Sequence, residues 1–237
     1  MFLNPDDADV TTLRQLIDAG AAAQLAEVLE RRPELARARI GDPDGESRTC
    51  LHVATDWPGQ RPDTAAVIGV LIDAGADVDA PFAGAHRETA LHWAASNDDV
   101  PALDALLDRG ASIEAPGGVL TGGPPLDDAV IFAQWRAARR LVERGASVRL
   151  FHAAALGLVE QAGVLLASGP SPDEVTAALW HACRAGEAAT AKLLVAAGGD
   201  PDWVGFDGMS PRAVARASGH TDLAAALDEG ERDDAEG

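Results

Sequence analysis

Residues 89–115 read TALHWAASNDDVPALDALLDRGASIEA, and the same pattern returns along most of the chain. Thr89 is suited to an N-cap, because its hydroxyl can accept a hydrogen bond from the free backbone N–H groups at a helix start. In the second half, leucines recur three and four positions apart, at Leu103, Leu106 and Leu107, as on one face of a helix. Gly110 follows, and glycine commonly ends a helix because it adopts left-handed backbone easily. The stretch therefore predicts two short helices in succession.

The unit repeats with a constant internal length. The leucine near the start of the first helix and the glycine after the second are 19 residues apart in four units: Leu91–Gly110, Leu126–Gly145, Leu150–Gly169 and Leu179–Gly198. A fifth unit, Leu51–Gly75, is longer by five residues, inserted around residues 58–63. Neither helix of such a unit can bury its apolar face alone, so the units must stack on their neighbours. These lengths predict an all-α fold.

These motifs resemble those of the ankyrin repeat family. Residues 49–54 (TCLHVA) and 89–94 (TALHWA) match its T-P-L-H-x-A signature, and residues 74–80 (AGADVDA) and 109–115 (RGASIEA) match its helix-ending G-A-D-V-N-A. The resemblance covers about residues 20–228. It implies an ankyrin-repeat solenoid of about seven helix-turn-helix units with short β-hairpin fingers. The bias to arginine, with Lys192 the single lysine, favours a bacterial member.

The resemblance also implies a division of the chain. We expect an N-terminal capping repeat and lead-in (1–46), five ankyrin-type repeats (47–203), a C-terminal capping repeat (204–230) and a disordered acidic tail (231–237). Three units depart from the signature histidine, with Asp127, Phe151 and Trp180 at that position. The link from Gly145 to Leu150 is too short for a hairpin finger. We expect Leu107 and Leu166 to fill the core between helices, and leave Trp135, Trp180 and Trp203 between core and groove.

In ankyrin stacks, one face of the first helices lines a concave groove. By helical periodicity this face takes the residue two after each anchor leucine and a residue four further on. The predicted groove residues are Asp56, Trp57, Trp93, Asn97, Asp128, Phe132, His152, Leu156 and His181. Alternatively, the tryptophans wedge between repeats and the histidines bond loop carbonyls. His52 and His92 fall at the family's signature position, which implies that they tether adjacent hairpins.

These residues leave three functions open. The first is a soluble cytoplasmic adaptor that binds a protein or peptide in the groove. The second is a small-molecule binder or an acid/base enzyme of isomerase, hydrolase or cyclase type, with candidate catalytic residues Asp128, His152 and His181. The third is an inhibitor or immunity protein whose acidic groove neutralises a basic partner. The first follows from the resemblance, although a fold alone does not dictate function.

Composition limits the partners. The net charge of −19 repels nucleic acid and anionic lipid surfaces and suits a basic or neutral partner. No run approaches the ~18 apolar residues of a membrane helix. Cys50 and Cys183 are expected to be free buried thiols, and no His or Cys spacing fits a metal site. The glycine-rich loop 116–125 lacks the Gly-Lys-Ser/Thr of a phosphate loop, so we predict a finger overhanging the groove and no cofactor.

Overall fold

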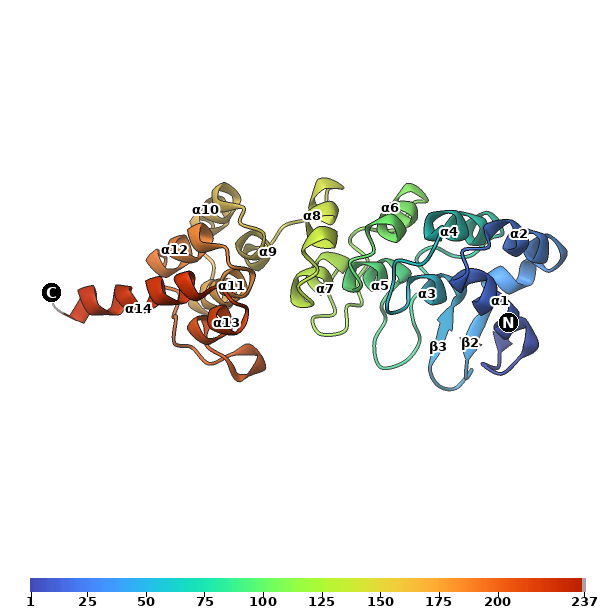
Figure 1. The fold of residues 1–237 in the computed structure, drawn as a ribbon, viewed down its shortest axis with the longest axis horizontal. Helices are drawn as coiled ribbons and strands as arrows, with labels where there is room; N and C mark the ends of the chain where they lie inside the picture. The colour runs from blue at the N-terminus through green and yellow to red at the C-terminus, as the bar shows by residue number, and fades with distance from the viewer. Residues whose placement is uncertain (236–237) are drawn as a thin grey trace. The chain divides into compact units, whose positions relative to one another are not determined.

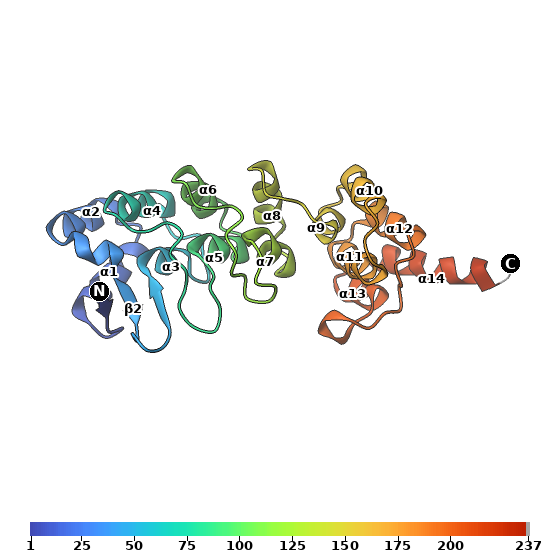
Figure 2. The same cartoon turned by 180° about the vertical axis from the view of Figure 1, so that it is seen from behind.

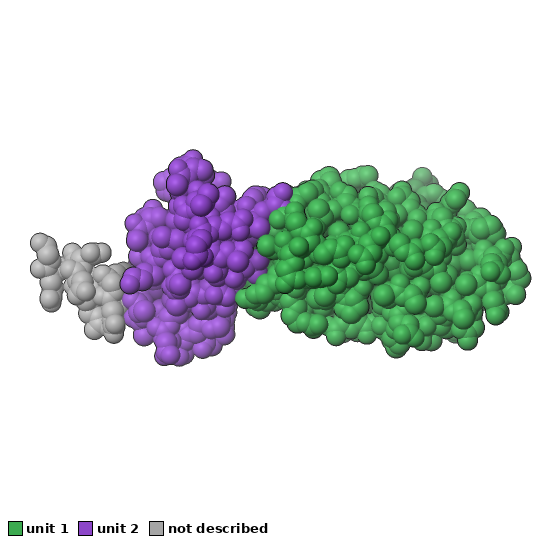
Figure 3. Space-filling view, turned by 90° about the horizontal axis from the view of Figure 1, so that it is seen from above, with its two compact units in different colours: residues 1–146 green, residues 147–237 purple. Residues whose placement is uncertain are grey.

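The computed structural model describes residues 1–235, which form seven consecutive helix-turn-helix pairs. The chain divides into two compact units, unit 1 (Met1–Ala146) and unit 2 (Ser147–Gly237), shown in green and purple in Figure 3. The expected all-α fold of about seven units with short hairpins is confirmed.

Unit 1 contains four helix pairs arranged in two layers. The pairs are α1 (Ala8–Asp18) with α2 (Ala22–Arg31), α3 (Cys50–Thr55) with α4 (Thr64–Asp73), α5 (Ala90–Ser96) with α6 (Val100–Asp108), and α7 (Pro125–Ile131) with α8 (Trp135–Glu143). The first helices α1, α3, α5 and α7 form the inner layer, and α2, α4, α6 and α8 form the outer layer (Figures 1 and 2). Each helix buries its apolar face against its partner and the next pair, as stacking requires.

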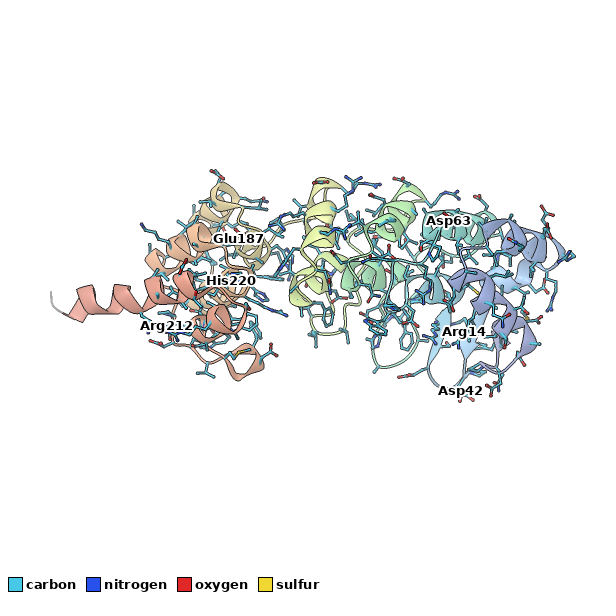
Figure 4. The ribbon with its side chains drawn as sticks, in the orientation of Figure 1. Arg14, Asp42, Asp63, Glu187, Arg212 and His220 are labelled. Atoms are coloured by element: carbon cyan, nitrogen blue, oxygen red, sulfur yellow. The ribbon has the colours of Figure 1, made fainter. Side chains whose placement is uncertain are left out.

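The segments between pairs extend from the inner layer of unit 1 on the side away from the outer layer (Figure 1). The first, after the 3₁₀ helix η1 (Pro33–Arg37), is a hairpin of β2 (Arg39–Gly41) and β3 (Ser47–Thr49), with β1 (Phe2–Leu3) parallel to β2. Asp42 lies in the turn of this hairpin (Figure 4). The next two segments, residues 81–88 and 116–124, are loops, and we call them the finger loops. Ala83 of the first finger loop pairs with Ser47 of β3.

The core of unit 1 lies between its layers. Leu91 of α5 and Leu103 and Leu106 of α6 are fully buried. Leu107 is only half-buried, so the expectation that it fills the core is wrong. The buried residues Ala102, Leu103 and Leu106 define the core face of α6, and Leu107, turned by about 100° from Leu106, lies at the edge of that face.

Unit 2 contains three helix pairs. They are α9 (Leu150–Ala155) with α10 (Val159–Ala167), α11 (Pro172–Ala185) with α12 (Ala188–Ala196), and α13 (Pro211–Ala217) with α14 (Thr221–Ala235), with the 3₁₀ helix η2 (Phe206–Gly208) before α13. Trp180 belongs to the core: it is 1% exposed, and its Nε1–H donates to the Met209 carbonyl at 3.1 Å. Trp203 packs against the same core, as do Leu165 and Leu166, which remain half-buried.

Helix α11 is longer than the other first helices, because a capping box begins it early. The hydroxyl of Ser171 accepts from the N–H of Glu174, and the Glu174 carboxylate accepts from the N–H of Ser171 at 2.8 Å. Pro172 occupies the first helical position, which favours proline. The chain therefore passes from α10 to α11 through residues 168–171, with no finger loop between them.

The C-terminal end differs from expectation. Helix α14 continues to Ala235, so residues 231–235, expected to be disordered, are helical. Residues 236–237 of the expected tail lie outside the described residues.

Candidate functional site

Two buried histidines connect the repeats of unit 1. His52 is the third residue of α3, where its Nδ1 accepts the N–H of Thr49 at 3.3 Å and its Nε2 lies 3.0 Å from the Glu88 carbonyl. His92 repeats this arrangement with Thr89 at 3.1 Å and the Gly123 carbonyl at 3.0 Å. Since Nδ1 accepts, Nε2 carries the proton and donates to the finger loop of the next repeat. The expected tethering role is therefore confirmed. Burial lowers the pKa of His52 to about 4, which keeps it neutral.

Next to these tethers lies a cluster that we call the acid–tryptophan cluster, formed by Glu88, Trp93 and Asp128. Glu88 ends the first finger loop, Trp93 lies in α5, and Asp128 lies in α7. The indole Nε1–H of Trp93 donates to Oε2 of Glu88 at 3.2 Å. Glu88 is 5% exposed and Asp128 is fully buried, while Trp93 is half-buried. Neither carboxyl oxygen of Asp128 accepts from a donor among the described residues, and its hydrogen-bonding neighbour is the carboxyl of Glu88.

Two adjacent carboxyl groups can bond to each other only by holding a proton. Burial, followed by the charge of Glu88 and its hydrogen bond, raises the pKa of Asp128 to about 8. Asp127 adds a smaller effect in the same direction. At neutral pH Asp128 therefore holds a proton beside the Glu88 carboxyl.

The second finger loop covers this pair. A Cβ on Gly118 would lie 2.7 Å from Oδ1 of Asp128, and one on Gly123 would lie 2.2 Å from Oδ2 of Asp127, so only glycine lets the loop approach this closely. Thr121 donates its hydroxyl proton to Asp127 at 2.7 Å. Asp127, at the position of the signature histidine, thus fixes the loop of its own repeat. The tip of the loop exposes Val119 and Leu120, the latter by 67%.

His86, also in the first finger loop, lies at the outer side of the cluster. Its ring stacks on Phe82 with centroids 4.6 Å apart, and its Nδ1 lies 2.7 Å from Oε2 of Glu88. The two atoms are close enough for an ion pair when the imidazole is protonated, but they lack the alignment of a hydrogen bond. Phe82 is buried and also packs near Trp93, with ring centroids 5.9 Å apart. The cluster is thus walled by aromatic rings on the side of the first finger loop.

The structure corrects the expectation for His152 and His181. His152 is fully buried at the third position of α9, and its Nδ1 accepts the N–H of Arg149 at 3.1 Å. This is the tether position of His52, so Phe151 replaces the anchor leucine and the expected groove position was one residue out. His181 is also buried, between the rings of Phe151, Trp180 and Phe206. Burial lowers the pKa of His181 to about 3, with Arg184 and His152 contributing.

The remaining predicted groove residues divide between surface and structure. Trp57 and Phe132 are exposed, by 78% and 40%. The Asn97 side-chain amide donates to the Thr55 carbonyl at 2.8 Å, which links two repeats. Asp56 forms a 2.6 Å ion pair with Arg48. Leu156 is buried at 6% exposure, so its expected place in a groove is wrong. The prediction that Asp128 and His152 lie close together joins the two units and stays a prediction.

The metal, thiol, cavity and membrane features of the described residues do not point to a second site. No group of three or more His, Cys, Asp or Glu among the described residues could hold a metal ion. Cys50 and Cys183 are free and buried, and burial raises both thiol pKa values to about 12. A cavity of about 930 Å³ in unit 2, bordered by α12 and α14, contains none of the predicted site residues. No helix among the described residues is long and apolar enough to cross a membrane.

Comparisons with known proteins agree with the geometry. A family model of the ankyrin repeat matches residues 86–115, which include His86, Glu88 and Trp93. Residues 86–115 are an ankyrin repeat. The crystal structure of the human ASB11 ankyrin repeat domain is similar to it, with a TM-score of 0.53 and 17% sequence identity over 90% of this chain and 96% of that one. No curated protein matches the chain. The ankyrin repeat fold generally mediates protein–protein interaction.

Sequence reasoning predicted Trp93 and Asp128 as site residues but missed Glu88 and His86. Both lie in a finger loop, where side-chain direction does not follow the 3.6-residue period that identified the helical positions. One signal was available: Glu88 directly precedes the N-cap Thr89, one repeat before the Asp127–Asp128 pair. An acidic side chain at that point lies beside the first turn of the next inner helix. This neighbour relation follows from stacking and not from periodicity within a helix.

Proposed function

We propose that this ankyrin repeat protein binds a protein or peptide partner on the finger-loop side of unit 1, at the acid–tryptophan cluster, through a basic residue of the partner. The observation that carries the proposal is the carboxyl pair of Glu88 and Asp128, in which Asp128 has no donor among the described residues. A buried carboxylate is costly unless a cation or donors accompany it, so the cluster suits a positive group supplied from outside.

The surroundings support a macromolecular partner. Trp93 is half-buried, and aromatic side chains concentrate binding energy at interfaces. Leu120 and Val119 expose apolar surface at the tip of the adjacent finger loop, which fits the polypeptide surface of a partner. The net charge of −19 attracts a basic protein and speeds its encounter. The inhibitor reading of the sequence is a special case of this proposal, and a cytoplasmic location stays a prediction.

The enzyme alternative receives no comparable support. His152 uses its Nδ1 as a helix-cap acceptor, and the pKa of His181 is lowered to about 3. A general acid or base works best with a pKa near the operating pH. Neither the cavity of about 930 Å³ in unit 2 nor the cavity beside the β1 strand is lined by Asp128, His152 or His181.

The test begins with peptides selected from a displayed random library against the full chain. Fluorescence anisotropy then gives the Kd of each selected peptide for the wild type, Glu88→Gln, Leu120→Ser and Asp108→Asn. The first two change the finger-loop side, and the third is a matched acid-to-amide change on the outer helix α6, where Asp108 is 68% exposed. We expect a loss of at least about tenfold for the first two only. Loss of affinity with Asp108→Asn alone would place the binding surface on the outer layer and refute the proposal.

A further inference from the structure

The three polar side chains around the cluster are ordered from the surface inward. The His86 side chain is 26% exposed, that of Glu88 is 7% exposed, and Asp128 is fully buried. His86 therefore lies where an entering group would first meet Glu88. Its Nδ1 approaches Oε2 of Glu88 at 2.7 Å without hydrogen-bond alignment, so this contact is weaker than the Trp93 bond to the same oxygen.

The inner part of the cluster lacks a positive group. Both oxygens of Asp128 are without a donor among the described residues, although two carboxyl groups together offer several acceptor sites. In the isolated chain burial raises the pKa of Asp128, so its carboxyl holds a proton at neutral pH. One proton satisfies only one of these acceptor sites, so a group with several donors in a plane would satisfy the pair better.

We infer that the partner residue recognised here is an arginine, whose guanidinium displaces His86 from Glu88 and pairs with the carboxyl groups of Glu88 and Asp128. This inference rests on the proposed function and names the chemistry of its contact. A guanidinium carries five N–H donors in a rigid fork, remains charged at all physiological pH values, and is less strongly hydrated than an ammonium group. It therefore enters a buried acidic site at a lower desolvation cost than lysine.

The exchange makes binding depend on pH. One proton leaves Asp128 for each guanidinium bound, so the affinity rises with pH until Asp128 is already ionised. The groups facing the pair are His86 from the first finger loop, His92 from α5 and Asp127 from α7. His92 remains neutral, because burial lowers its pKa. His86 and Asp127 stay within the site, and a His86→Ala variant separates the contribution of the imidazole from that of the carboxyl pair.

The experiment is an NMR titration of the ¹⁵N-labelled full chain with the peptide acetyl-Gly-Gly-Arg-Gly-Gly-amide. Matched peptides carry citrulline, which is the neutral isostere, or lysine at the central position. The indole N–H signal of Trp93, identified with Trp93→Phe, reports directly on Glu88, because this N–H donates to Oε2 of Glu88. Titrations at pH 6 and pH 7 are run on the wild type, His86→Ala, Asp128→Asn and the control Asp42→Asn, whose side chain lies on the β2–β3 hairpin (Figure 4).

We expect the arginine peptide to move the Trp93 signal and to bind about tenfold more tightly at pH 7 than at pH 6, as release of one proton requires. His86→Ala should tighten binding and keep this dependence, Asp128→Asn should weaken binding and remove it, and Asp42→Asn should change neither. Equal binding of the citrulline or lysine peptide, no binding of any peptide, or binding independent of pH would each overturn the inference. The proposed function would survive equal binding of the lysine peptide, no binding of these short peptides, or binding independent of pH, since selected peptides test it without assuming arginine. Equal binding of the citrulline peptide would also contradict the basic residue that the proposed function requires.

Discussion

Units 1 and 2 use the same tether position but place different residues beside it. In unit 1 the residues after the signature positions are Val53, Trp93 and Asp128, and the last two belong to the acid–tryptophan cluster. In unit 2 the residue after His152 is Ala153, which is fully buried, and the residue after Trp180, which stands at the signature position of its repeat, is the buried His181. The difference follows from the finger loops, which precede α5 and α7 but neither α9 nor α11. The finger loops place Glu88 next to Trp93 and Asp128, whereas in unit 2 His181 packs between the rings of Phe151, Trp180 and Phe206.

The two units also bury titratable groups of opposite type. In unit 1, burial together with the nearby Glu88 carboxyl raises the pKa of Asp128. In unit 2, burial together with Arg184 and His152 lowers the pKa of His181, so both shifts favour the neutral form. The comparison teaches that one backbone pattern buries either an acid or a base. On the proposed function, the residues next to the tether contact the partner, and the tether itself does not.

The largest expected effect tests whether the two units unfold separately. Leu106→Ala in unit 1 and Leu194→Ala in unit 2 each remove a fully buried leucine from a second helix, at a cost of about 2–5 kcal/mol. If the units unfold independently, each change lowers the midpoint temperature of one unfolding transition in differential scanning calorimetry. The midpoint temperature of the other transition then stays the same. Leu107→Ala, at a half-buried position of the same helix as Leu106, should cost less. Equal losses for Leu106 and Leu107 would show that the core face of α6 is misplaced.

The second prediction compares the histidines. His92→Leu keeps the bulk but leaves the Thr89 N–H and the Gly123 carbonyl unpaired, which should cost about 1–3 kcal/mol for a buried group left unsatisfied. Nδ1 of His181 has no hydrogen-bond partner among the described residues, so His181→Leu should be close to neutral. Urea unfolding of both variants at pH 7.5 measures the difference. The reverse order of stabilities would mean that His181 is the structural tether and His92 is not.

The third prediction concerns pH. Between the ordinary carboxyl pKa of 3.8 and about 8, folded Asp128 holds a proton that the unfolded chain has released. The folded state thus binds more protons, and stability decreases as pH rises through this range. Asp128→Asn should remove the decrease and stabilise the chain at pH 9, by about 1.4 kcal/mol for each tenfold difference in proton affinity between the folded and unfolded carboxyl group.

Measurements for this prediction belong above pH 7. Buried His52 has its pKa lowered to about 4, so its contribution acts in the opposite direction and is lost as pH falls from 6.5 towards 4. Asp108→Asn on the outer layer is the matched control and should follow the wild type at every pH. A wild-type free energy of unfolding that stays constant from pH 7 to pH 9 would show that Asp128 does not hold a proton in the folded state.

The smallest expected effect on stability is at the finger-loop tip. Leu120→Ser replaces an exposed side chain and should change the free energy of unfolding by less than about 0.5 kcal/mol. The same change should weaken partner binding, so the two measurements separate function from folding in one variant. A large destabilisation would mean that the tip packs against the chain and is not an interaction surface.

The fold was largely predictable, because each repeat has a constant length, a recognisable N-cap and a glycine that ends its second helix. Stacking of such repeats then allows few arrangements of the helices. Errors came where local signals competed. Leu150 matches the anchor leucines by spacing, but α9 begins at that residue and has the unusual N-cap Arg149, which shifts the register by one. The Ser171–Glu174 capping box, which extends α11, was overlooked. In the site, Trp93 and Asp128 followed from helical period, whereas Glu88 depends on the course of a loop.

The tethers of unit 1 make the site a property of neighbouring repeats. His52 of one repeat holds the backbone carbonyl of Glu88, Glu88 lies beside Trp93 in the next, and His92 holds the loop that covers Asp128 in the third. Grafting the cluster into a designed repeat protein would therefore require three consecutive repeats with their intervening segments. A single exchanged repeat would lack the hydrogen bonds from neighbouring repeats that position the carboxyl groups. Shuffling the repeats would likewise separate residues that belong to one site.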